Sequence, residues 1–203
     1  MKKKPSPSKK PAAGLNRSRI NRLRRLIKDR SFRISPRPKF RLSSGVMSRY
    51  YVNCKLVTLD AKGAALIGGL VYDRIKSLKP DGVGGLSLGA DPIAVSVAAT
   101  SASSRHPIPA FIVRKEPKGH GSRAWIEGGL ARGAKVVVVE DVMTTGKSTL
   151  QAVKRLRAHG CRIIKVLALV DRLEGGREKI EARGIPVEAL FTITDFLPSG
   201  RGV

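Results

Sequence analysis

Apolar runs rich in valine and isoleucine alternate with helical patterns along the chain beyond Phe40. Runs of this kind are typical of parallel strands that are covered on both faces. Strands are expected at about 82–88, 110–114, 135–140, 163–170 and 187–191, and helices at about 61–78, 91–103, 147–159 and 175–183. The alternation predicts an α/β fold with a doubly wound, mainly parallel sheet, and such sheets bind ligands at the carboxyl ends of their strands.

The N-terminal part has a different composition. Residues 1–14 are mainly lysine, proline and serine with almost nothing apolar to bury, so we expect a disordered basic tail. From Arg17 to Arg30 apolar residues recur at three- and four-residue steps, namely at Ile20, Leu23, Leu26 and Ile27. This is the period of one helical face and predicts an amphipathic basic helix. The remaining length is enough for one globular domain, which we place at residues 15–203.

The charge of the chain is concentrated at this end. The formal net charge is +25, and residues 1–41 hold 16 of the 40 Lys and Arg residues but one of the 15 acidic residues, Asp29. A basic helix can bind RNA or an anionic membrane, or serve as an organelle transit peptide. Helical faces more often pack on their own domain, and we expect that here. No RNA motif or aromatic platform accompanies the charge, so nucleic acid binding through the tail is the less favoured alternative.

Other sequence features bear on the location of the protein. No apolar run is long enough to span a bilayer, and the basic N-terminus is not followed by the apolar segment of a secretory signal. Cys54 and Cys161 belong to no CxxC or Cys/His cluster, so they predict reduced, buried thiols and neither a disulfide framework nor a zinc site. We expect a soluble, cytoplasmic protein without a membrane partner.

The stretch KVVVVEDVMTTGKST, residues 135–149, carries the most chemical information. Glu140 and Asp141 follow an apolar strand, where paired acids can accept hydrogen bonds from two ribose hydroxyls. Residues 144–148 then offer backbone N–H groups and hydroxyls at a helix N-terminus, which together suit a phosphate. The pattern predicts a ribose 5-phosphate site. A Walker A loop is excluded because its first glycine would fall at Asp141, and an ordinary capped helix would need neither acid.

A second stretch, FIVRKEPKGHG at residues 111–121, is strongly cationic. Its basic donors are Arg114, Lys115, Lys118 and His120, while Pro117, Gly119 and Gly121 allow the backbone to move. Such a loop can close on a polyanion, although a solvated basic turn is an equally common interpretation of the residues alone.

These motifs together resemble a known family. The apolar strand, the Glu-Asp pair and the Thr-Thr-Gly-x-Ser turn resemble the phosphoribosyl diphosphate motif of type I phosphoribosyltransferases. Residues 111–121 resemble the mobile catalytic loop of orotate phosphoribosyltransferases, and LSSGVMSRYY, residues 42–51, resembles their orotate-binding segment. GLSLGADPIA, residues 85–94, and LVDRLEGG, residues 169–176, are also similar. The resemblance covers about residues 17–203.

The resemblance implies a fold and an activity. It implies a type I phosphoribosyltransferase core at residues 59–203, preceded at residues 15–58 by the N-terminal helix and a small hood segment that binds orotate. It further implies a magnesium-dependent transfer of ribose 5-phosphate from phosphoribosyl diphosphate to orotate, in pyrimidine nucleotide synthesis. The alternatives are transfer to another base, or an RNA-binding regulator on the same fold.

The resemblance also implies the roles of particular residues. The catalytic residues are Lys118, His120 and Asp141. The residues that bind phosphoribosyl diphosphate are Arg114, Lys115, Lys118, His120, Glu140, Asp141, Val142, Met143, Thr144, Thr145, Gly146, Lys147 and Ser148. In this family the loop reaches into the neighbouring subunit, which implies a homodimer with shared active sites. Magnesium would arrive with the diphosphate, with no dedicated protein cage.

Orotate is a planar anion, so its site should offer a cation, small donors and an aromatic face. Arg172, which ends a predicted strand with Asp171 as its orienting partner, could pair with an acceptor edge. The other expected orotate contacts are Ser44, Tyr51 and Thr144, with Ser43 and Gly45 as further donors. Tyr51 as a packing residue and the serines as turn residues are the alternatives.

The chain departs from the family at four positions. Val46 and Met47 stand where relatives often have basic residues, Arg49 where proline is frequent, and Gly89 where some relatives have a lysine. No lysine role can therefore be assigned at position 89, and the orotate contacts are less firmly implied than the reaction class.

Overall fold

A six-stranded sheet forms the centre of the structure, a computed structural model that describes residues 13–41, 45, 47–117 and 124–198. The strand order is β10-β9-β8-β5-β6-β7. The strands are β5 (Gly82–Leu86), β6 (Ala110–Val113), β7 (Ile126–Glu127), β8 (Lys135–Met143), β9 (Arg162–Asp171) and β10 (Val187–Thr192). Neighbours pair in parallel, except that β7 runs antiparallel to β6. The predicted mainly parallel α/β sheet is confirmed.

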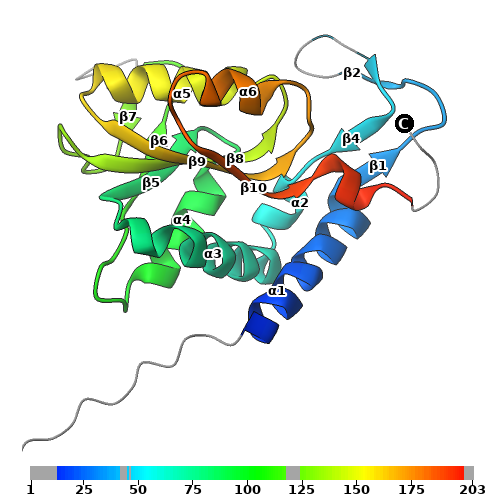
Figure 1. Cartoon of the computed structure of the whole chain (residues 1–203), viewed down its shortest axis with the longest axis horizontal. Coiled ribbons are helices and arrows are strands. Elements are labelled where there is room, and N and C mark those ends of the chain that lie inside the picture. The colour runs from blue at the N-terminus through cyan, green and yellow to red at the C-terminus, as the bar shows by residue number, and fades with distance from the viewer. Residues whose placement is uncertain (1–12, 42–44, 46, 118–123, 199–203) are drawn as a thin grey trace, which may run out of the picture.

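Helices cover both faces of this sheet. In Figure 1, α3 (Ala61–Ile75) and α4 (Asp91–Ser101) lie on one face, and α5 (Lys147–Ala158) and α6 (Gly176–Glu181) on the other. Along β8, Val137 and Val139 pack into the core with α3 and α4, whereas Val136 and Val138 pack into the core with α5. Both faces need apolar residues, which explains why the strand reads as one continuous apolar run.

The strand order reverses direction at β5. From β5 the chain moves through α4 to β6 on one side, and later returns to β8 on the other side of β5. The segments that follow β5 and β8 therefore leave the sheet in opposite directions. In doubly wound sheets ligands bind at such a reversal, beyond the carboxyl ends of the strands, so a ligand site is expected here.

The N-terminal helix docks on this core, as expected. Helix α1 (Ala13–Leu26) continues as the π-helical η1 (Ile27–Ser31) and packs on α3. Leu23 and Ile27 are completely buried, and the guanidinium of Arg19 pairs with Asp73 at 3.0 Å. The apolar face of the helix is thus used within the domain, which leaves its basic side exposed. The basic tail predicted at residues 1–14 lies almost wholly outside the described residues, since residues 1–12 are not described.

A small hood follows α1, at the right of Figure 1. Strand β1 (Phe32–Ile34) pairs with β4 (Tyr50–Val52), and β2 (Phe40–Arg41) pairs with β3 (Met47–Ser48), both antiparallel. Helix α2 (Lys55–Thr58) leads back to α3. The short helices η2 (Lys76–Leu78) and η3 (Ile193–Phe196) complete the described elements, and Phe196 of η3 packs on Phe32 with ring centroids 5.9 Å apart.

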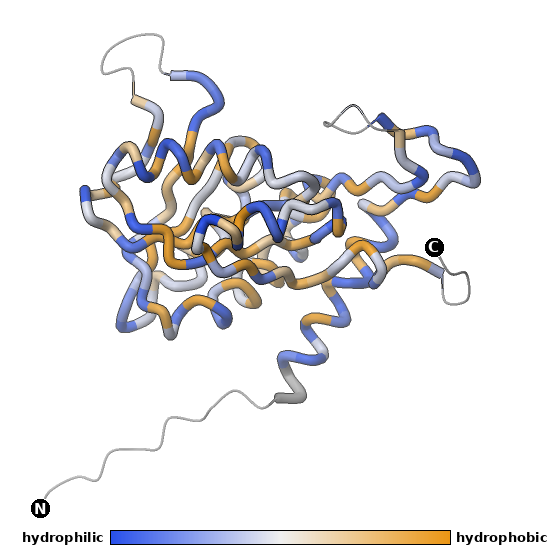
Figure 2. Tube along the Cα trace, turned by 45° about the horizontal axis from the view of Figure 1, so that its top comes forward, coloured by the Kyte–Doolittle hydropathy of each residue, from blue (hydrophilic) through white to orange (hydrophobic). Residues whose placement is uncertain are grey.

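The distribution of hydropathy follows these layers. Figure 2 shows apolar segments concentrated in the central strands and hydrophilic ones on the outer helices and turns. Cys54 and Cys161 are free and buried, as predicted for their thiols. Within the described part of the chain, no helix combines the length and apolar character that a membrane crossing would require.

Candidate functional site

The acidic pair lies inside β8 and not beyond it. The strand was predicted to end at Glu140, but it continues to Met143 because its last residues pair with the end of β9, Met143 opposite Asp171. Successive side chains of a strand point to opposite faces. Glu140 accordingly turns toward α5, where its Oε2 accepts a hydrogen bond from Thr149 Oγ1 at 2.8 Å, and Asp141 turns toward the segment after β5. Both carboxylates are almost fully buried.

The turn after β8 encloses a cavity of about 340 Å³. Its lining runs from Glu140 through Val142 to Thr149. Gly146 adopts the left-handed conformation, with φ 75°, and α5 begins at the next residue. The first turn of α5 contains no acidic residue, and no side chain caps it. The alternative of an ordinary capped helix therefore does not hold, and unsatisfied N–H groups with the positive end of a helix dipole face the cavity.

Gly176, at the start of α6, packs against this turn from behind. A Cβ atom placed on Gly176 would lie 2.3 Å from the carbonyl oxygen of Thr144 and 2.9 Å from the nitrogen of Gly146. A Cβ atom on Gly146 would in turn lie 3.0 Å from the carbonyl oxygen of Gly176. The turn of residues 144–148, called the phosphate turn after its predicted ligand, and the N-terminus of α6 thus approach each other backbone to backbone. The sequence signal for this contact is the Gly-Gly pair of LVDRLEGG, whose role sequence reasoning missed.

Glu140 occupies an unfavourable place for a charge. Burial and the neighbouring Asp141 carboxylate raise the pKa of Glu140 well above its ordinary value of 4.5, and the hydrogen bond from Thr149 only partly opposes this. Near neutral pH this carboxyl group therefore holds its proton more tightly than an exposed glutamate does.

This raised pKa predicts how stability depends on pH. An unfolded glutamate loses its proton around its ordinary pKa, whereas folded Glu140 keeps its proton to higher pH. Over that interval the folded state binds more protons than the unfolded state, so the free energy of unfolding falls as pH rises. Urea unfolding between about pH 5 and about pH 8 should show this fall in the wild type and a smaller one in Glu140→Gln. Parallel profiles of the two proteins would contradict it.

Asp141 faces a different set of groups. Lys55 Nζ, from α2 at the end of the hood, lies 3.7 Å from Asp141 Oδ2, and Asp141 Oδ1 accepts from the backbone N–H of Val142 at 2.9 Å. A Cβ atom on Gly89 would lie 2.4 Å from Asp141 Oδ1. This distance shows that the segment after β5 reaches the acid, as the crevice between β5 and β8 requires. Sequence reasoning missed Lys55, because no local motif marks it.

Arg172 follows β9 directly and joins the core to the hood. Its guanidinium donates to Glu174 Oε1 at 2.7 Å, to the Tyr50 carbonyl at 3.3 Å and to Ser48 Oγ at 3.1 Å. The expected role of Asp171 was wrong, because Asp171 pairs with Arg177 at 3.2 Å and accepts from the backbone N–H of Leu173. Glu174 orients Arg172 instead.

The other residues expected at orotate lie on the hood or at the turn. Tyr51 stacks on Phe40 with ring centroids 5.4 Å apart and leaves 40% of its surface exposed. Thr144 begins the phosphate turn, and Gly45 is exposed with φ 86°. Ser43 and Ser44 lie outside the described residues.

The cationic stretch begins at the end of β6, on the far side of β5 from β8. Arg114 Nη1 pairs with Glu127 at 3.2 Å, and the Arg114 backbone N–H donates to the Trp125 carbonyl at 2.9 Å. The residue after it, Lys115, is exposed. Lys118 and His120, predicted to be catalytic, lie outside the described residues.

Comparisons with known proteins agree with this geometry. A family model described as a phosphoribosyl transferase domain matches residues 58–188, more than half of the chain. An orotate phosphoribosyltransferase of Aquifex aeolicus is 52% identical over 176 residues, which are 87% of this chain and 96% of that protein. One from a Synechocystis species is 53% identical over 157 residues, 77% of this chain and 79% of that protein.

Solved structures of an orotate phosphoribosyltransferase also superpose on this chain. The orotate phosphoribosyltransferase of Mycobacterium tuberculosis, crystallised with Fe(III) dicitrate, superposes with a TM-score of 0.75 at 36% identity, covering 88% of this chain and 98% of that one. The same enzyme crystallised with 5-phospho-α-D-ribosyl 1-diphosphate gives a TM-score of 0.72 at 35% identity, with the same coverage.

Proposed function

The chain belongs to the orotate phosphoribosyltransferase family, and we propose that it transfers ribose 5-phosphate from phosphoribosyl diphosphate to orotate, releasing pyrophosphate. The product, orotidine 5'-phosphate, places the reaction in pyrimidine nucleotide synthesis. The observation that carries the proposal is the cavity after β8, where the uncapped start of α5 and the carboxyl group of Glu140 line one space.

The sugar phosphate is held from two sides in this proposal. The N–H groups and hydroxyls of residues 144–148 bind the 5-phosphate, because a helix N-terminus without its own acid or cap favours an anion. Asp141 and Glu140 accept hydrogen bonds from the ribose hydroxyls at the end of β8. These contacts fix the glycosidic carbon at the crevice between β5 and β8.

The diphosphate leaves toward the cationic stretch after β6. Arg114, Lys115, Lys118 and His120 are proposed to bind it. The diphosphate gains negative charge as its bond to the ribose breaks, so donors aimed at it stabilise the transition state more than the bound substrate. Orotate is proposed to lie beneath the hood, near Arg172 and Thr144, with Ser44 and the exposed ring of Tyr51 as further contacts.

Magnesium is proposed as the metal of the reaction, and the site is compatible with it. Mg²⁺ prefers hard oxygen ligands and commonly binds through substrate phosphates with one or two carboxylates. In the part of the chain that the structure describes, no three His, Cys, Asp or Glu side chains group into a possible cage. Asp141 and Glu140 are the carboxyl groups of the site that could contribute oxygen ligands beside those of the substrate. The bound ion would neutralise part of the diphosphate charge.

The direct test of this function follows pyrophosphate release. We expect pyrophosphate only when orotate, phosphoribosyl diphosphate and magnesium are all present, with a matching loss of orotate absorbance. Release with adenine, guanine or uracil in place of orotate would redirect the proposal to transfer onto another base.

Because its substrates and product are phosphorylated or charged and cross membranes poorly, we also propose a cytoplasmic location.

A homodimer with shared active sites is proposed from the likeness of residues 111–121 to the loop of the family. It predicts that mixing inactive Lys118→Ala with inactive Asp141→Asn protein restores activity after subunit exchange. Half of randomly formed dimers are hybrids, and each hybrid has one site with both residues intact, so about a quarter of wild-type activity should return. Each variant put through exchange alone is the control. No recovery, with exchange demonstrated by mass, would show that each subunit uses its own loop.

A further inference from the structure

Arg155, on the outer side of α5, contacts both ends of the segment that contains residues 118–123. Its Nη1 donates to the carbonyl of Arg114, and its Nη2 donates to the carbonyl of Lys115 at 2.8 Å. Its guanidinium carbon also lies 3.8 Å from the ring centroid of Trp125. One side chain therefore holds the main chain before the segment and the aromatic ring after it.

Trp125 is one of the exposed large apolar residues of the described chain. Its ring is 40% exposed, and a cavity of about 610 Å³ lies between residues 124–126 and the outer face of α5. The backbone hydrogen bond from Arg114 to Trp125 and the pair between Arg114 and Glu127 join the two ends to each other, but not to α5. Among the described residues, the contacts of Arg155 are the side-chain contacts that tie both ends to the helix, in addition to the pairing of β6 and β7 within the sheet.

The same helix begins at the phosphate turn. Lys147 opens α5, and Arg155 lies eight residues farther along. An α-helix rises 1.5 Å per residue, so a rigid rod of about 12 Å joins the turn to Arg155. Through Arg155, Arg114 and Lys115 are therefore attached to α5, the helix whose first N–H groups face the cavity after β8.

We propose that Arg155 and Trp125 form a clamp, defined by these two residues, that positions Arg114 and Lys115 relative to the phosphate turn. This inference rests on the proposed function, in which Arg114 and Lys115 bind the diphosphate while the turn binds the 5-phosphate. Neither clamp residue touches substrate, so both are positioning residues. They set the separation between two anion sites that one substrate must span.

The choice of arginine follows from its geometry. A guanidinium is planar and donates in a fork, so it can reach two successive carbonyls while its face stacks on an indole ring. A lysine ammonium is a point charge without a stacking face. Arg155→Lys should therefore keep the positive charge but lose the paired hydrogen bonds to the two carbonyls and the stacking on Trp125.

The kinetic test compares Arg155→Met with Arg157→Met. Arg157 is exposed on the same helix and donates to the Arg183 carbonyl at 3.2 Å, so both variants lose one charge and a main-chain contact. We expect kcat/KM for phosphoribosyl diphosphate to fall about tenfold or more in Arg155→Met, because small misplacements of binding groups can cost up to about a hundredfold. KM for orotate should stay within about twofold, and Arg157→Met should match the wild type within about twofold. For Arg155→Lys, kcat/KM for phosphoribosyl diphosphate should lie between the values of the wild type and Arg155→Met.

A spectroscopic test follows the clamp without turnover. Trp125 is the one tryptophan of the chain, so intrinsic fluorescence reports on it directly. Titration with pyrophosphate should change the emission of the wild type and of Arg157→Met, and the change should be lost or shifted in Arg155→Met. If Arg155→Met does not fold, Trp125→Leu provides the kinetic test, because it removes the stacked ring and leaves Arg155 in place.

The outcomes separate the clamp from the proposed function. Equal kcat/KM and equal fluorescence titrations for Arg155→Met and Arg157→Met would overturn the clamp even in a fully active enzyme. A wild type that releases no pyrophosphate from orotate and phosphoribosyl diphosphate would instead overturn the function. In that case the fluorescence comparison still decides whether Arg155 links Trp125 to anion binding.

Discussion

Asp141→Asn should retain the fold and lose about a hundredfold to a thousandfold in turnover, the range seen when one aligned electrostatic group is removed from an active site. Asparagine has nearly the same shape, so the packing beside Gly89 and the hydrogen bond from the Val142 N–H can survive. The charged acceptor proposed for the ribose hydroxyls and the partner of Lys55 are lost. The effect therefore falls on chemistry more than on stability.

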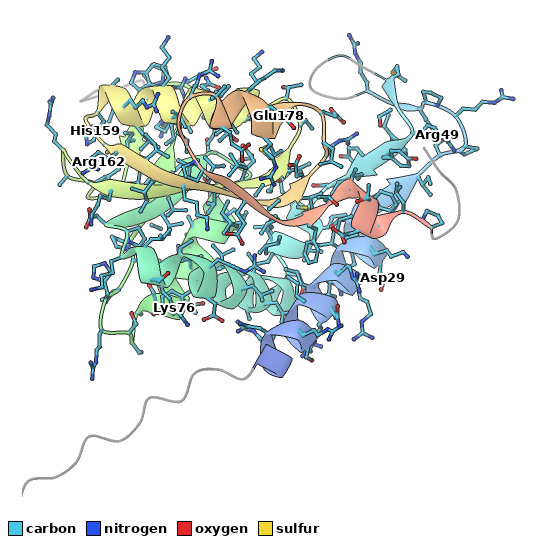
Figure 3. The ribbon with its side chains drawn as sticks, in the orientation of Figure 1. Asp29, Arg49, Lys76, His159, Arg162 and Glu178 are labelled. Atoms are coloured by element: carbon cyan, nitrogen blue, oxygen red, sulfur yellow. The ribbon has the colours of Figure 1, made fainter. Side chains whose placement is uncertain are left out.

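Steady-state kinetics with both substrates and thermal unfolding together check this expectation. Asp29→Asn is the matched control, because it makes the same chemical change on an exposed residue at the outer side of the N-terminal segment, labelled in Figure 3. It should match the wild type in both measurements. If Asp141→Asn also turns over at the wild-type rate, Asp141 has no part in the reaction.

Gly176→Ala should weaken phosphoribosyl diphosphate binding about tenfold to a hundredfold and also lower stability. The added methyl group would lie 2.3 Å from the Thr144 carbonyl oxygen, so the backbone of the phosphate turn has to move. N–H groups that bind a phosphate depend on their direction, and displacements near 1 Å can cost about a hundredfold. Overpacking of this kind typically destabilises a protein by about 1–3 kcal/mol.

The adjacent glycine gives a sharp control for this change. Gly175 has φ 79°, and a Cβ atom there would meet nothing within 4 Å. Gly175→Ala should therefore cost only backbone strain, about 1 kcal/mol, and leave KM for phosphoribosyl diphosphate nearly unchanged. Calorimetry and substrate titration separate the two variants. Equal substrate affinity in both would show that the approach of α6 to the turn does not matter for binding.

The fold was predictable because its signal is local and repeated. Each central strand is a continuous apolar run, since both of its faces are buried, and turn or helix residues separate the runs. The hood strands β1 to β4 were missed for the opposite reason. They are two or three residues long, which is too short for any periodicity to appear.

The site likewise has a part that the sequence predicts and a part that it does not. Residues 140–148 are contiguous, so one motif predicted both the acids and the turn. The prediction that β8 ends at Glu140 was wrong because the pairing with β9, and not the arrival of charged residues, decides where the strand stops. The contacts of Lys55 and the partners of Arg172 join segments far apart in the chain, and local pattern carries no information about them.

The two acids of β8 point to opposite faces of the sheet, so different parts of the chain hold them in place. Glu140 accepts a hydrogen bond from Thr149 of α5, whereas Asp141 pairs with Lys55 of α2 and borders the segment after β5. A change in the hood can therefore shift the partner of Asp141 while the contact of Glu140 with α5 stays in place.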